Sequence, residues 1–241
     1  MKIISKNYLK FLKKAYEKYK FIKFEDNFDK SEKVILWRHD IDFSPHRAFS
    51  MAKEEYKLGI KAYYFVHVSS IYYNVLEPYI SELIRKIYSL GHIIGVHFDA
   101  SKYNENNFQR IEENIKFEAN IIERIIDDDI KVFSLHNPST VRKVSLDKTS
   151  YFGLINASSS KLLRNFKYCS DSNGFWRFES LNNLLLDDNI NRLYVLTHPV
   201  WWQEEEMSPR DKISRSILGR STNCLNSYDK LLKANNSQNI R

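Results

Sequence analysis

Carboxylate and imidazole side chains follow directly after an apolar run near the start of this chain. Residues 34–37 read Val-Ile-Leu-Trp, which predicts a buried strand, and Arg38, His39, Asp40 and Asp42 come next. Side chains alternate along a strand, so Asp40 and Asp42 are expected to point to the same side. Two converging carboxylates repel each other, and a shared proton or a bound cation relieves that repulsion. An ion pair between Arg38 and one aspartate is the simpler alternative.

Three later apolar runs end in the same kinds of side chain. They are followed by His97 and Asp99, by His136, and by His198. In parallel α/β folds, sites are built at the carboxyl ends of the strands and in the loops just after them. Four such strand ends that carry His or Asp therefore indicate one shared site.

The chemistry that this set of side chains suits is metal-assisted hydrolysis. Imidazole and carboxylate ligands without cysteine thiolates suit zinc, or another divalent first-row metal, in a catalytic role. Such a metal polarises a carbonyl group and lowers the pKa of a bound water. A free carboxylate can accept the proton of that water, and a histidine on the opposite side can protonate a leaving group. Asp40 and Asp42 would then divide the work, one as base and one as ligand.

The elements that must position these residues alternate regularly. Apolar runs and helical periodicity predict strands at 34–37, 62–66, 93–97 and 131–136, with helices at 48–58, 78–90 and 108–126. This alternation predicts parallel strands with crossover helices, in an open doubly wound sheet or in a closed barrel. Further along, the sequence predicts short strands at 151–157, 167–170, 176–178 and 193–198, and a helix from 209 to 218 or somewhat beyond.

Length and composition set the domain organisation. The chain has 241 residues, a mass of 28.7 kDa and 43% hydrophobic residues, which is enough for one domain with a large core. We expect a single catalytic domain over 1–241. Its first 33 residues form an N-terminal helical extension with a helix at 8–19, and a loose polar tail begins at about residue 230.

Net charge, cysteine content and the absence of long apolar segments predict which partners the protein has and where it is located. The formal charge of +7 comes without a basic block interleaved with aromatics, so it predicts surface lysines or an anionic small substrate and no nucleic acid. Cys169 and Cys224 form no close pair and are expected to be reduced. Neither a signal peptide nor an apolar stretch of ~18–20 residues is recognisable, so we expect a cytoplasmic protein that does not span a membrane. These features do not predict the oligomeric state.

Four segments resemble one family of enzymes. They are residues 38–42 (Arg-His-Asp-Ile-Asp), 91–99 (Gly-His-Ile-Ile-Gly-Val-His-Phe-Asp), 134–138 (Ser-Leu-His-Asn-Pro) and 196–199 (Leu-Thr-His-Pro). From about Val34 to Trp202 the chain resembles the polysaccharide deacetylases of carbohydrate esterase family four, the NodB-homology group. It is most similar to small, divergent members found among surface-polysaccharide genes. The resemblance implies an α/β fold, an irregular, partly open (β/α)7 barrel, and a divalent metal, usually zinc, that serves to hydrolyse the acetamido group of N-acetylated sugars.

The resemblance also implies roles for single residues. Asp40 matches the general base, Asp42 the metal-binding aspartate, His97 the first metal histidine and His198 the catalytic acid. The family's second metal histidine would stand at Ser101, so the third ligand must come from elsewhere. His136 is the first candidate and Asp99 the second, with His198 left open.

Other residues receive supporting roles from the same comparison. The family's arginine motif is not recognisable, and residues 171–177 can replace it, with Arg177 steadying Asp40 and Asp171 orienting His198. A turn at Asn173-Gly174 explains that segment equally well. Substrate contacts are expected at Asn137, Trp201 and Trp202, although core packing explains the tryptophans equally well. His39 and His92 are expected either to support the site or to be structural, and no function is assigned to His46 or His67.

The function predicted from these residues is metal-dependent N-deacetylation of an amino sugar in surface polysaccharide biosynthesis. Without an export signal, a nucleotide- or lipid-linked sugar intermediate is the expected substrate. Two alternatives remain open at this point. The chain could be a catalytically degraded sugar-binding or scaffolding protein, or it could be a metal hydrolase of another ester or amide.

Overall fold

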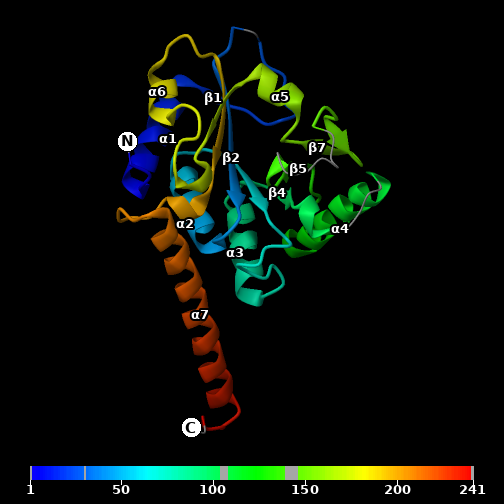
Figure 1. Ribbon diagram of the computed structural model, residues 1–241, viewed down its shortest axis with the longest axis vertical. Coiled ribbons are helices and arrows are strands. Elements are labelled where there is room, and N and C mark those ends of the chain that lie inside the picture. Colours follow the sequence, from blue (N-terminus) through cyan, green and yellow to red (C-terminus); the bar gives the residue numbers. More distant parts are fainter. Residues whose placement is uncertain (1, 30, 104–107, 139–145, 240–241) are drawn as a thin grey trace.

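A curled, open sheet of mostly parallel strands forms the centre of the molecule (Figure 1). The computed structural model describes residues 2–29, 31–103, 108–138 and 146–239. Its strands are β1 (Lys20–Phe21), β2 (Val34–Ile41), β3 (Tyr63–Val66), β4 (Ile93–Phe98), β5 (Val132–Leu135), β6 (Ser150–Tyr151), β7 (Leu154–Asn156), β8 (Lys167–Ser170) and β9 (Arg192–Thr197). Its α-helices are α1 (Ser5–Lys18), α2 (Pro45–Lys57), α3 (Pro78–Ser89), α4 (Phe108–Ile126), α5 (Ser160–Asn165), α6 (Leu181–Leu186) and α7 (Pro209–Ala234). Three short 3-10 turns are η1 (Ala100–Lys102), η3 (Ser172–Gly174) and η4 (Pro199–Trp201).

The strand order makes the sheet a partly open barrel. The strands run β6-β7-β5-β4-β3-β2-β9-β8, and β1 pairs with β2 outside this path. Only β6 and β7 pair antiparallel among the described strands; all other neighbours are parallel. Because β6 and β8 are the two ends of the path and do not pair with each other, the sheet stays open. The α/β fold class and the partly open barrel expected from the sequence are confirmed.

Strand β2 holds the middle of the sheet. It pairs with β3 on one side and with β9 on the other, and all eight of its residues are buried. Strands with both faces covered belong to parallel α/β sheets, where crossover helices pack on the faces. Here α2, α3 and α4 connect β2, β3, β4 and β5 in turn. The strand is longer than the sequence predicts and continues through Arg38, His39 and Asp40 to Ile41. The ladder with β9 extends to His39, and the ladder with β3 extends to Ile41.

Local sequence explains where the crossover helices begin and end. The hydroxyl of Ser44 accepts a hydrogen bond from the backbone N–H of Arg47, and Pro45 fills the first turn of α2, where its missing N–H costs nothing. Gly59 follows α2 with φ +70°, a left-handed conformation that suits glycine at a helix end. Gly91 plays the same part after α3, with φ +86°. The apolar side of each helix packs on the sheet and builds one contiguous core.

The sequence misplaced some of the smaller elements. The helix predicted at 108–126 and the strand predicted at 167–170 have those bounds in the structure. Residues 176–178 are not a strand, and β1, α5 and α6 were not predicted. The loose tail expected from about residue 230 is wrong for its first part, because α7 continues to Ala234. No helix in the described ranges is long and apolar enough to cross a membrane.

Gly95 in β4 gives a stability prediction next to the site. A Cβ at Gly95 would lie 2.7 Å from two ring carbons of Phe65 and 2.9 Å from the carbonyl oxygen of Val132. We therefore expect Gly95→Ala to lower the free energy of unfolding by about 1–3 kcal/mol. Gly219→Ala in α7, where nothing lies within 4 Å of the new Cβ, is the control and should stabilise the helix by about 0.5–1 kcal/mol. Urea unfolding of both variants measures the difference, and equal midpoints would contradict the prediction.

Candidate active site

Ionisable side chains from six neighbouring strands meet at one edge of the sheet. Strands β5, β4, β3, β2, β9 and β8 are consecutive and parallel, so their carboxyl ends lie together. In that order, the described side chains at their ends are His136, His97 and Asp99, His67, Asp40 and Asp42, His198, and Asp171. The convergence predicted from the strand ends is therefore present in the structure.

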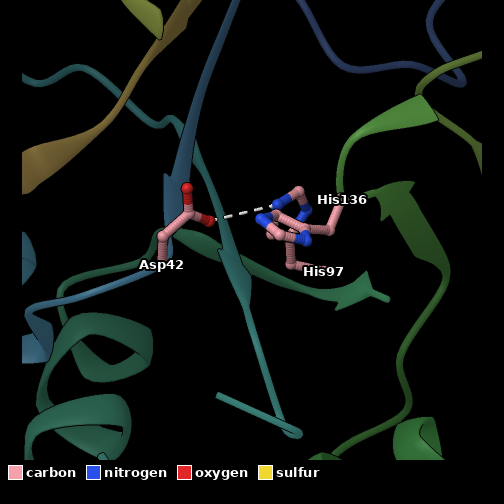
Figure 2. A group of neighbouring side chains, drawn as sticks. All are labelled: Asp42, His97 and His136. Carbon is pink, nitrogen blue, oxygen red and sulfur yellow. Dashed lines mark ion pairs between the residues drawn. The ribbon is translucent and has the colours of Figure 1, made fainter. Parts of the chain in front are cut away.

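Asp42, His97 and His136 form a group that can hold a metal ion (Figure 2). Each offers one ligand atom, and these atoms all lie within 4.8 Å of one another. His97 Nε2 lies 3.2 Å from Asp42 Oδ1, while His97 Nδ1 lies 2.7 Å from the hydroxyl of Ser134. When Nδ1 donates to Ser134, the lone pair of Nε2 faces the carboxylate, and a cation between them removes the repulsion. Three protein ligands leave a coordination position for water, as in catalytic zinc sites.

A second group shares one residue with the first. His67, Asp99 and His136 also offer ligand atoms within 4.8 Å of one another. Asp99 Oδ2 lies 3.2 Å from His136 Nδ1 and 3.8 Å from His67 Nε2. Its other oxygen accepts hydrogen bonds from the backbone N–H and the hydroxyl of Ser101, at 3.0 and 2.6 Å. Ser101 stands where the resemblance expected a metal histidine, and here it orients Asp99 instead. Both candidates for the third ligand, His136 and Asp99, thus lie at the site.

His67 is a site residue that the sequence reasoning missed. Its side chain is buried, and its Nε2 has no hydrogen-bond partner among the described residues. Burial and, to a smaller extent, the neighbouring imidazole of His97 lower the pKa of His67 to about 3, so the imidazole of His67 is neutral and keeps a lone pair for a cation. The signal was present in the sequence, because His67 follows β3 directly, as His136 follows β5.

The charge state of Asp42 suits a metal ligand. Burial alone would raise the pKa of this carboxyl, but the hydrogen bond and charge of His97, with the charges of His198 and His136, outweigh it. The pKa of Asp42 therefore lies below its ordinary value, and the carboxylate is ionised at neutral pH. An ionised carboxylate among histidines, with an orphaned imidazole nitrogen beside it, fits a divalent cation of the zinc type.

Asp40 is held by a buried arginine on its own strand. Arg38 Nη2 donates to Asp40 Oδ2 at 2.8 Å, and Nη1 donates to the hydroxyl of Tyr194 at 2.8 Å. Burial would lower the pKa of Arg38, yet the charges of Asp40 and Tyr194 raise it overall, so the guanidinium stays charged. Asp40 Oδ1 has no hydrogen-bond partner among the described residues. One oxygen is fixed and the other is left to accept a proton.

The arginine beside Asp40 is a correction to the sequence reasoning. That role was assigned to Arg177, but the ion pair belongs to Arg38. Residues two apart on a strand share a face, so Arg38 and Asp40 are neighbours by construction. Arg177 lines the same cavity, with its guanidinium 6.0 Å from the ring centre of Phe178.

His198 and Asp171 are paired as the sequence predicted. His198 Nδ1 lies 2.7 Å from Asp171 Oδ1, and the backbone N–H of His198 donates to the same oxygen at 2.9 Å. The indole N–H of Trp202 donates to Asp171 Oδ2 at 2.8 Å. Burial alone would lower the pKa of His198, but the hydrogen bond and charge of Asp171 raise it to about 9, with smaller contributions from the charges of Asp42 and Asp40. His198 is therefore protonated at neutral pH, and its Nε2 lies 3.8 Å from Asp42 Oδ2.

One cavity of about 490 Å³ connects these groups. Its lining includes Asp40, Asp42, His97, His136 and His198. A cavity of this volume accommodates a sugar-sized ligand.

Two of the three residues predicted to contact the substrate line this cavity. Asn137 and Trp201 line the cavity, and Asn137 has φ +47°, a left-handed conformation that asparagine tolerates and that turns the chain after β5. Trp202 is 0% exposed and does not line the cavity, so of its two predicted roles the structure shows core packing and not the sugar contact. Its ring packs in the core while its N–H holds Asp171, which is the usual way a buried tryptophan satisfies its donor.

His39 and His92 meet at the carboxylate of Glu55. On β2, His39 alternates with Arg38 and Asp40 and so faces α2, where its Nε2 lies 2.7 Å from Glu55 Oε1. Tyr8 and Tyr64 donate their hydroxyls to the same carboxylate, and His92 Nδ1 lies 3.6 Å from it. The sequence reasoning did not single out Glu55. A charged residue on the apolar side of a predicted helix was the available signal.

His67 gives a prediction that isolates metal binding. Histidine residues around a metal site typically change its affinity 10–100-fold, so we expect His67→Ala to weaken zinc binding by about that factor. His46→Ala is the matched control, because His46 is exposed and lies outside both ligand groups. Competition with a chromophoric chelator measures both affinities. Equal affinities in the two variants would show that His67 does not reach the ion.

Comparison with known proteins finds similar solved structures at low sequence identity. No family model and no curated protein matches the sequence. Among solved structures, the catalytic domain of peptidoglycan N-acetylglucosamine deacetylase from Eubacterium rectale is 15% identical, with a TM-score of 0.49 over 82% of this chain and 87% of that one. Peptidoglycan deacetylase PdaC from Bacillus subtilis is 13% identical, with a TM-score of 0.47 over 86% and 99%. A carbohydrate esterase family 4 pseudoenzyme from Bacillus anthracis is 12% identical, with a TM-score of 0.45 over 80% of this chain and 61% of that one. The chain thus spans about three fifths of that pseudoenzyme. At low sequence identity, the chain is similar in structure to the carbohydrate esterase family 4 deacetylases.

Proposed function

We propose that this protein is a divalent-metal-dependent hydrolase that removes an N-acyl group, in the simplest case acetyl, from an amino sugar. One observation carries the proposal: a single cavity brings together the ligand group Asp42, His97 and His136, the carboxylate of Asp40, and the protonated imidazole of His198. Base, acid and ligand set are the three parts that metal-assisted amide hydrolysis requires.

The ligand group would hold the metal ion, which acts as a Lewis acid. Asp42, His97 and His136 would hold the ion, with His67 and Asp99 next to them. When bound, a divalent metal polarises the acyl carbonyl and makes a coordinated water acidic.

Asp40 accepts the proton of the attacking water. Arg38 fixes one of its oxygens and leaves the other without a partner among the described residues, so the second oxygen is available to the water. The buried guanidinium pairs with Asp40 at 2.8 Å and so holds its carboxyl group in one orientation toward the cavity.

His198 delivers a proton to the departing nitrogen. As the C–N bond breaks, the amine must gain a proton to leave, and His198 carries one at neutral pH. Asp171 holds its Nδ1, so Nε2 is the nitrogen that faces the cavity and Asp42. After turnover, the proton taken up by Asp40 and the one lost by His198 balance.

For the substrate, we propose a nucleotide- or lipid-linked amino sugar from surface-polysaccharide synthesis. Asn137, Arg177 and Trp201 on the cavity wall supply an amide, a guanidinium and an indole ring for the sugar and its linkage. A formal charge of +7 favours an anionic carrier by long-range attraction.

The test combines metal analysis with an acetate-release assay on a panel of nucleotide- and lipid-linked N-acetyl sugars. Because both ligand groups share His136, we expect about one tightly held divalent ion per chain, loss of acetate release on chelation, and its return with zinc. A bound ion with turnover of other esters only would assign the site to another bond. Absence of any bound ion, with sugar binding retained, would make the protein a sugar-binding relative without catalysis.

A further inference from the structure

Helix α7 stands away from the rest of the molecule. Figure 1 shows it, in orange to red, extending from the body toward the C-terminus. Only Lys212 is buried in this helix of 26 residues, and every residue from Ser221 to Leu231 is exposed. The second half of α7 therefore does not pack against the hydrophobic core of the described residues.

The side of α7 that meets the body is polar. Arg215, Gly219 and Asn223, spaced four residues apart, line a cavity of about 600 Å³ together with Arg220, and α2 and α3 form part of its wall. Arg220 Nη1 donates to Glu77 Oε2 at 2.8 Å.

The other side of α7 is apolar and open to solvent. At 100° per residue, the side chains opposite the cavity-lining ones are mostly Leu, Ile and Tyr. The exposed fractions of the large ones are 48% for Ile217, 66% for Leu218, 62% for Leu225, 48% for Tyr228 and 59% for Leu231. We call these five residues the α7 stripe. A contiguous apolar surface of this kind marks an interaction site.

The exposed half of α7 needs a partner to stay helical. Isolated helices shorter than about 12–15 residues are marginal in water, and helices in proteins draw most of their stability from a packed apolar side. Residues 221–227 include Ser, Thr, Asn and Cys, which are weak helix formers. The stripe is the surface whose burial would supply the missing stability.

The sequence of the stripe indicates which partner fits. Leu218, Leu225 and Leu232 are spaced by seven residues, with Tyr228 three residues after Leu225, which is the a/d spacing of a two-helix seam. A membrane-surface helix carries Lys and Arg all along its polar side. In α7 the basic residues stand at the two ends, at 210–220 and 230–233, and residues 221–228 between them contain no charge. A seam of this kind is complementary to itself, as a two-fold dimer interface requires.

We propose that α7 pairs with α7 of a second copy of this chain, stripe against stripe. A specific interface buries about 1,200–2,000 Å² in total. Five large apolar side chains on each of two chains, each about half exposed or more, supply much of the lower end of that range. The charged residues of the exposed half, Asp229, Lys230 and Lys233, lie off the seam and do not oppose pairing.

The experiment is sedimentation equilibrium of the full chain over a concentration series. We expect twice the monomer mass of 28.7 kDa for the native chain. The double variant Leu218→Gln, Leu225→Gln should sediment as a monomer, with a dissociation constant raised at least 100-fold. Gln and Leu have similar helix propensities, so the change removes the seam and keeps the helix. The control Asn223→Gln, Asn226→Gln alters the opposite side of α7 and should remain a dimer.

Three results would overturn the proposal. They are a monomeric native chain at every concentration, a double variant that still dimerises, and a control variant that dissociates equally. If the native monomer instead binds vesicles with anionic lipid and the double variant does not, the occupant of the stripe is a membrane surface. Far-UV circular dichroism and urea unfolding measured in parallel show that each variant folds, so this test stands apart from that of the catalytic proposal.

Discussion

Replacing Asp40 by asparagine is expected to lower kcat by about 10²–10⁴-fold while zinc stays bound. Asparagine keeps the shape of the side chain, and its carbonyl oxygen still accepts the hydrogen bond from Arg38. It cannot take a proton from water, so only the basic function is lost. Acetate release and zinc content, measured on the same preparation, separate the two effects.

Asp42→Asn is the matched comparison for this experiment. It makes the same chemical change two residues along the chain, on a residue whose carboxylate lies 3.2 Å from His97 Nε2. We expect it to lose zinc and activity together, because a neutral amide is a poor ligand for zinc. If the Asp40 variant keeps full activity, or if it loses zinc as the Asp42 variant does, the division of work between the two aspartates is wrong.

The sequence predicted the site residues that topology alone brings together. Parallel strands end at one edge, so Asp40, Asp42, His97, His136 and His198 had to converge once the strands were recognised. No knowledge of side-chain packing was needed for that step. The hydrogen-bond and ion-pair partners of these residues could not be predicted in the same way, because they depend on side-chain rotamers and on which neighbouring side chain is nearer. The pairing of Arg38 with one aspartate was the simpler alternative from the sequence, and the structure shows it, whereas Arg177 does not pair with Asp40.

His67 and Trp202 show the two ways in which position along the chain misleads. His67 follows β3 as directly as His136 follows β5, but the strand-end rule was applied to four other strands and not to β3. Trp202 follows a site histidine in sequence and was expected at the substrate, yet η4 turns it into the core. Both outcomes depend on how a loop folds after the strand ends, which local sequence does not determine.

The C-terminal helix was underestimated for a physical reason. Residues 221–227 have low helix propensity, and a reading of local preference ends the helix before them. Tertiary or quaternary packing routinely overrides such weak preferences. The continuation to Ala234 thus agrees with a stabilising contact along the α7 stripe, although it was not predictable from one chain.

Loss of His198 is expected to cost about as much as loss of Asp40, and the pH dependence should reveal how. His198→Ala should lower kcat by about 10²–10⁴-fold, because the amine then leaves without its proton donor. In the native enzyme, a donor whose pKa is raised to about 9 is charged at neutral pH and loses its proton as the pH rises through that value. The rate should therefore fall on the alkaline side.

Asp171→Asn tests whether Asp171 sets that alkaline limit. The substitution removes the negative charge that raises the pKa of His198, so the alkaline fall of kcat should move to lower pH. Trp202→Phe is the control, because it removes one hydrogen bond to Asp171 and leaves the charge in place. A kcat profile at saturating zinc measures both. A change in the pKa of His198 must move the alkaline fall of kcat along the pH axis. If the Asp171 variant instead loses activity equally at every pH, Asp171 only holds the geometry of the site and does not set the pKa of His198.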